Sequence, residues 1–250
     1  VDLLTHSEEE VMGVIDHEGG HRDITVVEQG IPLVQKYFTD ASKHFLWNAI
    51  EDPRVNNWVK HRLPGAEHYL HKLYDRYVPE SSGPLPAPPS ASEVDKAMKG
   101  DAGTAFDPRF MGLPHIEFTW AINYYWRHGK VPEFRSPSAR EAFDKARPDL
   151  DKVFTRFPSE TDPSRDRRLA YSLDALKIID EKILPLYEPL VKRSEEKLAK
   201  SLRGKNSQGQ GQSGKGSSGG APNMNQPQQP QGQKPGSQDG KPQNGEKDPK

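Results

Sequence analysis

The composition of the C-terminal part of the chain limits where a folded core can form. Residues 204–250 consist mainly of Gln, Gly, Ser, Asn, Pro and Lys, and their only apolar side chains are Ala221 and Met224. Such a segment buries too little apolar surface to offset the entropy lost on ordering. We therefore predict one folded domain over residues 1–203, large enough for a well-buried core, followed by a disordered linker or tail.

The folded part is expected to be mainly α. Apolar residues recur there at helical spacing, and no segment shows the alternating pattern of a half-buried strand. Pro53 lies inside one predicted helix and indicates a kink or break near residues 49–52, and a bend is expected at Pro185 and Pro189. The predicted helices cover residues 5–23, 31–40, 41–63, 64–78, 114–128, 136–146 and 164–202.

The segment HEGGH, residues 17–21, has the composition of a metal site. On a helix, side chains four residues apart differ by about 40° around the axis, so His17 and His21 can reach one ion. Glu18 then points beside the ion, where it can take a proton from an activated water and pass it to a leaving amine. The adjacent glycines are unfavourable in a helix interior and indicate close approach of another backbone or a ligand.

Two other observations bear on this interpretation. The chain contains no cysteine, so any metal must be held by His, Asp or Glu side chains. A pattern with three fixed positions in five also arises by chance in on the order of one in a hundred chains of this length. A chance match on an amphipathic helix is thus the alternative, and the helical context favours the metal site.

A catalytic zinc needs a third protein ligand and an open fourth position. Glu51 lies on a helix about 30 residues after His21, and a helix, a turn and a returning helix bring it back to the site. Its stretch is apolar, with Trp47 nearby, which is unfavourable for an unpaired carboxylate unless it binds a cation. The alternative is that Glu51 and Asp52 form an acidic pair that is salt-bridged to Arg54.

HEGGH followed by WNAIEDPRVN resembles the gluzincin pattern, in which a glutamate ligand follows an HExxH motif. More narrowly, residues 8–60 resemble the zincin-like domains that precede von Willebrand factor A domains in some bacterial and archaeal proteins, which carry a helix of the type N-x-L-E-D-x-R-x-E. The resemblance implies a zinc metallopeptidase in which His17, His21 and Glu51 hold Zn²⁺ and Glu18 is the general base. It also implies supporting roles for Asn48, Asp52 and Arg54.

Two features depart from that family pattern. Asn56 and Asn57 stand where an acidic residue is common. A zincin also has an antiparallel sheet before its HExxH helix, whereas this chain begins at Val1, only a few residues before the motif. We expect either that an upstream segment carries the sheet or that this is a minimal or non-peptidase form.

A second function is compatible with the same resemblance. Some proteins of this type work with AAA+ ATPases as adaptors, and the chain would then be a non-catalytic metal-binding interaction domain tethered to a downstream von Willebrand factor A domain. Glu18 favours the peptidase, because a structural metal has no use for a general base. A helical scaffold without metal requires the whole pattern to be a coincidence.

Further His and Tyr residues receive weaker predictions. Glu67, His68 and His71 have spacing that suits a metal, although a polar helix face is the expected role. A zinc peptidase is expected to have an oxyanion donor. Most of the residues considered for this role lie in a segment that is expected to form helical core, so no donor is assigned. The residues considered for this role are His115, Tyr124, Tyr125, His128 and Tyr171.

Charge and hydropathy restrict the partners. The net charge is −1, and the lysines of the tail are scattered, so we expect neither nucleic-acid nor membrane binding. No apolar run is long enough to span a bilayer, and no signal peptide is recognised. The lack of cysteine favours a cytoplasmic location. The expected partner is a peptide or protein substrate.

Overall fold

The computed structural model describes residues 5–28, 30–80, 112–159 and 164–208, and within these ranges it is mainly helical and contains no strand. The predicted mainly α class is therefore confirmed. The helices, with one π-helical turn η3, are α1 (Glu8–Ile24), α2 (Pro32–Phe38), α3 (Ala41–Arg62), α4 (Ala66–Tyr77), α6 (Pro114–His128), α7 (Pro137–Phe154), α8 (Arg165–Ile178), η3 (Ile179–Ile183) and α9 (Leu184–Gln208).

The last helix runs past the predicted end of the domain. Helix α9 ends at Gln208, so residues 204–208 of the predicted tail are helical. Residues 209–250 lie outside the described residues. The π-helical turn η3 ends at Ile183, just before Leu184 and Pro185, and Pro185 is one of the two positions at which a bend is expected.

Helix α1 begins at Glu8, a few residues after the predicted start, with Ser7 as its N-cap. The Ser7 hydroxyl accepts a hydrogen bond from the Glu10 N–H at 3.3 Å, and the Glu10 carboxylate accepts one from the Ser7 N–H at 2.6 Å. This reciprocal capping satisfies two N–H groups that a helix end otherwise leaves unpaired. The HEGGH segment therefore lies well inside a regular helix.

Helix α3 continues through Pro53, so the predicted break near residues 49–52 does not occur. A helical proline has no N–H for the carbonyl four residues earlier, which here belongs to Ala49. The side-chain amide of Asn123 on α6 donates to that carbonyl at 3.5 Å. Residues before and after Pro53 therefore keep one helical register.

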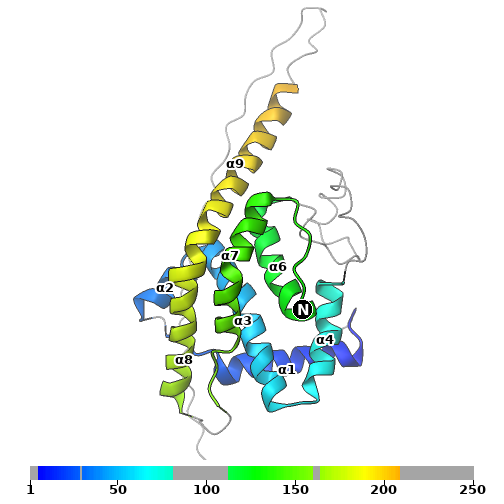
Figure 1. Ribbon diagram of the computed structural model, residues 1–250, viewed down its shortest axis with the longest axis vertical. Helices are drawn as coiled ribbons and strands as arrows, with labels where there is room; N and C mark the ends of the chain where they lie inside the picture. The colour runs from blue at the N-terminus through cyan, green and yellow to red at the C-terminus, as the bar shows by residue number, and fades with distance from the viewer. Residues whose placement is uncertain (1–4, 29, 81–111, 160–163, 209–250) are drawn as a thin grey trace, which may run out of the picture. The chain divides into compact units, whose positions relative to one another are not determined.

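Most of the apolar core lies among α2, α3, α6, α7, α8, η3 and α9. Helix α1 packs against α3 and α4, at the other side of α3 (Figure 1). A smaller cluster, which includes Ile24, Val55, Val59 and Leu70, fills the space where α1, α3 and α4 meet. Helix α3 is thus held on both sides, and its contact with α1 positions the HEGGH segment.

The two adjacent glycines have different surroundings. A Cβ on Gly20 would lie 2.5 Å from Val59 Cγ2 and 2.6 Å from Val55 Cγ1, whereas a Cβ on Gly19 would meet nothing within 4 Å. The predicted close approach of another element is thus found at Gly20, where α1 packs on α3, and not at Gly19. Glycine at position 20 is what allows the two helices to come this close.

We expect opposite effects from Gly20→Ala and Gly19→Ala. The first overpacks the α1–α3 contact and should lower the free energy of unfolding by about 1–3 kcal/mol. The second removes a helix glycine in open space and should raise it by about 0.5–1 kcal/mol. Urea denaturation of the two variants beside the wild type measures both changes. Equal effects would contradict the packing of α1 on α3.

Candidate metal centre

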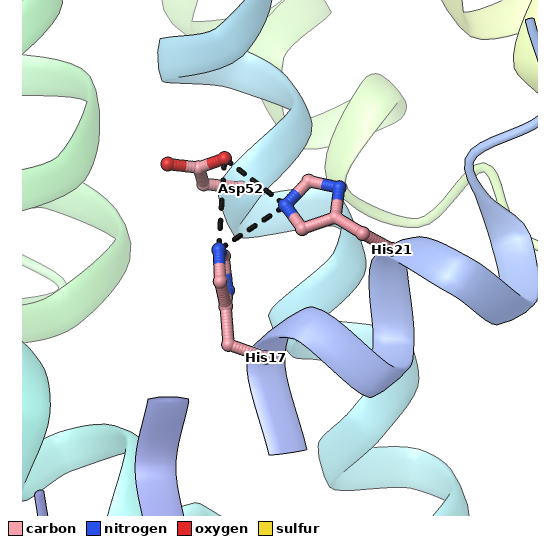
Figure 2. Close-up of side chains that lie close together, drawn as sticks. All are labelled: His17, His21 and Asp52. Carbon is pink, nitrogen blue, oxygen red and sulfur yellow. Dashed lines mark hydrogen bonds and ion pairs between the residues drawn. The ribbon is translucent and has the colours of Figure 1, made fainter. Parts of the chain in front are cut away.

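Three side chains from two helices converge on one point (Figure 2). His17 Nε2 and His21 Nε2 on α1 lie 3.1 Å apart, and Asp52 Oδ1 on α3 lies 3.3 Å from His21 Nε2 and 3.9 Å from His17 Nε2. Ligands of a tetrahedral zinc with bonds of about 2.0–2.1 Å are separated by about 3.3 Å. The spacing of the three atoms therefore suits a shared metal ion.

The far nitrogen of His17 is held by a buried amide. His17 Nδ1 lies 2.8 Å from Oδ1 of Asn56, a fully buried residue of α3. Because an amide oxygen only accepts hydrogen bonds, Nδ1 is the protonated nitrogen of this ring. In the neutral ring, Nε2 therefore presents a bare lone pair toward Asp52.

The far nitrogen of His21 is held through a hydroxyl. His21 Nδ1 lies 3.0 Å from Thr25 Oγ1, and that hydroxyl donates to Glu51 Oε1 at 2.6 Å. Because the Thr25 hydroxyl donates its hydrogen to Glu51, its oxygen accepts the hydrogen bond from His21 Nδ1. The neutral His21 ring thus also presents a bare Nε2.

These hydrogen bonds leave two imidazole lone pairs and one carboxylate oxygen facing each other. In the neutral rings, none of the three atoms carries a proton for the others, and a cation placed among them satisfies all three. Burial alone would lower the pKa of His21, but its hydrogen bond to Asp52 and the charge of that carboxylate outweigh burial, and the net shift is upward. The site therefore attracts positive charge.

The structure does not bring Glu51 into this group. Its carboxylate is buried and accepts from Arg54 Nε at 2.7 Å and from Thr25. Burial alone would raise the pKa of Glu51, but the charge and hydrogen bonds of Arg54 hold it below its usual range. Of the alternative weighed above, the structure contains the Glu51–Arg54 ion pair, whereas Asp52 lies beside the two histidines and not beside Arg54. Asp52, the next residue, stands where the sequence analysis placed Glu51.

Helical geometry explains this difference. Consecutive residues on a helix point about 100° apart, so Glu51 and Asp52 cannot both face α1 in the same way. Arg54 lies one turn after Glu51 and donates also to the Arg156 carbonyl at 2.6 Å. The buried carboxylate thus meets its need for a positive partner from its own helix, without a metal.

Loss of the Glu51 charge should destabilise the fold. Glu51→Gln leaves the fully buried Arg54 guanidinium without its counter-charge, and breaking a buried pair costs about 3–5 kcal/mol. Urea denaturation of chelator-treated protein measures this separately from any metal effect. The double variant Glu51→Leu/Arg54→Met is the control and should recover much of the loss. A single-variant loss below about 1 kcal/mol would show that the pair contributes little.

The three side chains line a cavity of about 640 Å³. Helices α1, α3, α4 and α6 all contribute to its wall, and Glu18 lines it beside His17 and His21. The Glu18 carboxylate is exposed, so it is accessible to water and to a ligand in the cavity. The predicted general base and the histidines therefore share one accessible space.

Two functional residues were missed by the sequence analysis. Asn56 departs from the family pattern, yet it is the group that orients His17. Tyr74 on α4 lines the cavity, with its ring centroid 6.4 Å from that of His17. Burial, with the negative charge of Asp52, raises the pKa of Tyr74 well above 10, so its hydroxyl stays protonated at neutral pH. Only the contact between α4 and α1 could reveal it.

None of the residues considered as oxyanion donors lines the cavity, and several have other partners. The ring nitrogen of His128 donates to the Val78 carbonyl at 2.7 Å, and the Tyr125 hydroxyl donates to Asp151 at 3.1 Å. The cavity wall likewise does not include the other three residues considered, which are His115, Tyr124 and Tyr171.

The two histidines of the second cluster each lie beside a glutamate. His68 Nε2 lies 2.8 Å from Glu9 Oε1, and His71 Nε2 lies 3.6 Å from Glu67 Oε1. These two histidines form part of a polar helix face, as expected. Over the ranges that the structure describes, the group with metal-ligand geometry is His17, His21 and Asp52.

Comparisons with protein-family models, curated proteins and solved structures found no match to this chain. The zincin-like resemblance therefore stays a proposal based on the residues. None of the described helices combines the length and the apolar character needed to cross a membrane.

Proposed function

We propose that this protein is a zinc-dependent peptidase of zincin-like type, with His17, His21 and Asp52 as the metal ligands. The observation that carries the proposal is the convergence of their three ligand atoms in a cavity that Glu18 also lines. Two imidazoles and one carboxylate are a common catalytic zinc set, which leaves a position for water and substrate. The same set also serves Fe(II), and the adjacent Glu18 favours hydrolysis.

Each residue of the site has a distinct task in this mechanism. When bound, zinc supplies a Lewis acid that makes water nucleophilic near neutral pH. The Glu18 carboxylate takes a proton from the attacking water and delivers it to the amide nitrogen of the leaving group. The protonated Tyr74 hydroxyl is a hydrogen-bond donor in the same cavity, suited to the developing negative charge of the carbonyl oxygen. Asn56 and Thr25 accept hydrogen bonds from the Nδ1 atoms of His17 and His21 and so fix the orientation of the two rings.

Metal removal tests the proposal directly. Chelator-treated chain, reloaded separately with Zn²⁺ and Fe²⁺, is assayed for metal content and for cleavage of casein. We expect one zinc per chain, loss of cleavage after chelation, and recovery with zinc. Cleavage that survives complete chelation, or no uptake of zinc, would contradict the proposal.

Zinc uptake without cleavage of any protein substrate would favour the other function. In that case the chain is a metal-binding adaptor domain that works with an AAA+ ATPase or with a downstream von Willebrand factor A domain. The exposure of Glu18 and the size of the cavity at the metal site support the peptidase instead.

A further inference from the structure

The cavity extends beyond the metal centre along an apolar, largely aromatic wall. Three buried side chains form part of this wall. They belong to Leu73, Tyr74 and Trp120, which are 5%, 8% and 5% exposed. Phe45 and Tyr77 also line it and are 43% and 47% exposed, which places apolar rings at its open side. A ligand at the metal therefore has an aromatic surface beside it.

The charges of the cavity are one-sided. The described residues that line it include the carboxylates of Glu18 and Asp52, and no lysine or arginine. Zinc at the metal centre would offset the charge of Asp52, but an acidic side chain beyond it would lose hydration beside Glu18 without a basic partner. An apolar side chain meets no such cost and removes apolar surface from water.

We propose that the cavity binds the large apolar side chain, preferably aromatic, of an extended peptide next to the bond at the metal, and discriminates against acidic side chains. The inference rests on the proposed function, because the metal centre defines which bond is cleaved.

Binding of three peptide hydroxamates to the zinc-loaded full chain tests this inference. The probes differ only in one side chain, which is benzyl, methyl or carboxymethyl, and calorimetry gives each Kd. We expect the benzyl probe to bind about tenfold to a hundredfold more tightly than the methyl probe, and the carboxymethyl probe to bind least. Equal affinities of the three probes on zinc-loaded protein would overturn the inference and leave the proposed function intact.

Two neighbouring residues of α1 provide matched variants. Val14 lines the cavity, whereas Ile15 is 56% exposed and does not line it. Val14→Phe should fill the space and remove the preference for benzyl over methyl, while Ile15→Phe should leave it unchanged. Loss of the benzyl preference in Ile15→Phe, with retention in Val14→Phe, would place the side-chain site elsewhere.

A metal-free measurement separates the two proposals. Trp47 and Trp120 line the cavity, so their fluorescence can report binding of N-acetyl-phenylalanine amide and N-acetyl-alanine amide to zinc-free chain. If the chain takes up no zinc but still prefers the phenylalanine amide, and Val14→Phe abolishes that preference, the cavity assignment stands and the peptidase fails. No preference in either metal state overturns the cavity assignment.

Discussion

We expect Asp52→Ala to weaken zinc binding by about a hundredfold or more, because it removes one of the three protein atoms that would hold the ion. Among the described residues that line the cavity, Glu18 is then the only anionic partner left for His17 and His21, and it is exposed. Competition with a chromophoric zinc chelator gives the Kd of the variant and of the wild type. Circular dichroism of both proteins checks that the overall helix content is unchanged.

Glu51→Gln is the matched comparison for Asp52→Ala. The amide retains an oxygen that can accept from Thr25, so the hydrogen bond that orients His21 can persist. We expect zinc affinity to fall by about tenfold at most in the folded fraction, although the fold itself is weakened. A larger loss of zinc from Glu51→Gln than from Asp52→Ala would restore Glu51 as the ligand and contradict the structure.

Glu18→Gln will retain zinc and lose cleavage. The amide has nearly the shape of the carboxylate but cannot take a proton from water, and general acid–base catalysis contributes about 10²–10⁴-fold. We therefore expect kcat/KM on casein to fall by about a thousandfold, with zinc content unchanged.

Asp16→Asn is the control for Glu18→Gln. Asp16 lies on the same helix, two residues earlier, and does not line the cavity. Its substitution removes an equal charge from α1 and should leave both zinc content and cleavage near wild-type values. If both variants lost cleavage equally, the effect would come from the charge of α1 and not from proton transfer by Glu18.

Local sequence signals predicted most of the helices. The Ser7–Glu10 capping pair and the apolar periodicity are properties of neighbouring residues, and the structure contains the helices they predict. Pro53 indicated a kink or a break, and the break does not occur; Asn123, distant in sequence, donates to the carbonyl that the proline leaves without an N–H partner. No local pattern reveals such a compensation.

The candidate site could be predicted only in part for the same reason. His17 and His21 follow from helix geometry alone, since both lie on one helix. The choice between Glu51 and Asp52 depends on how α3 is rotated about its axis against α1, and on Arg54 facing Glu51. That rotation is set by tertiary packing, including the contact of Gly20 with Val55, and not by the residues around the carboxylates.

The hydrogen bonds behind His21 connect the cavity to a distant part of the chain. His21 meets Thr25, Thr25 donates to Glu51, Arg54 pairs with Glu51, and Arg54 donates to the carbonyl of Arg156, just after α7. The orientation of the His21 imidazole therefore depends on a backbone carbonyl that belongs to neither of the two helices that carry the candidate ligands.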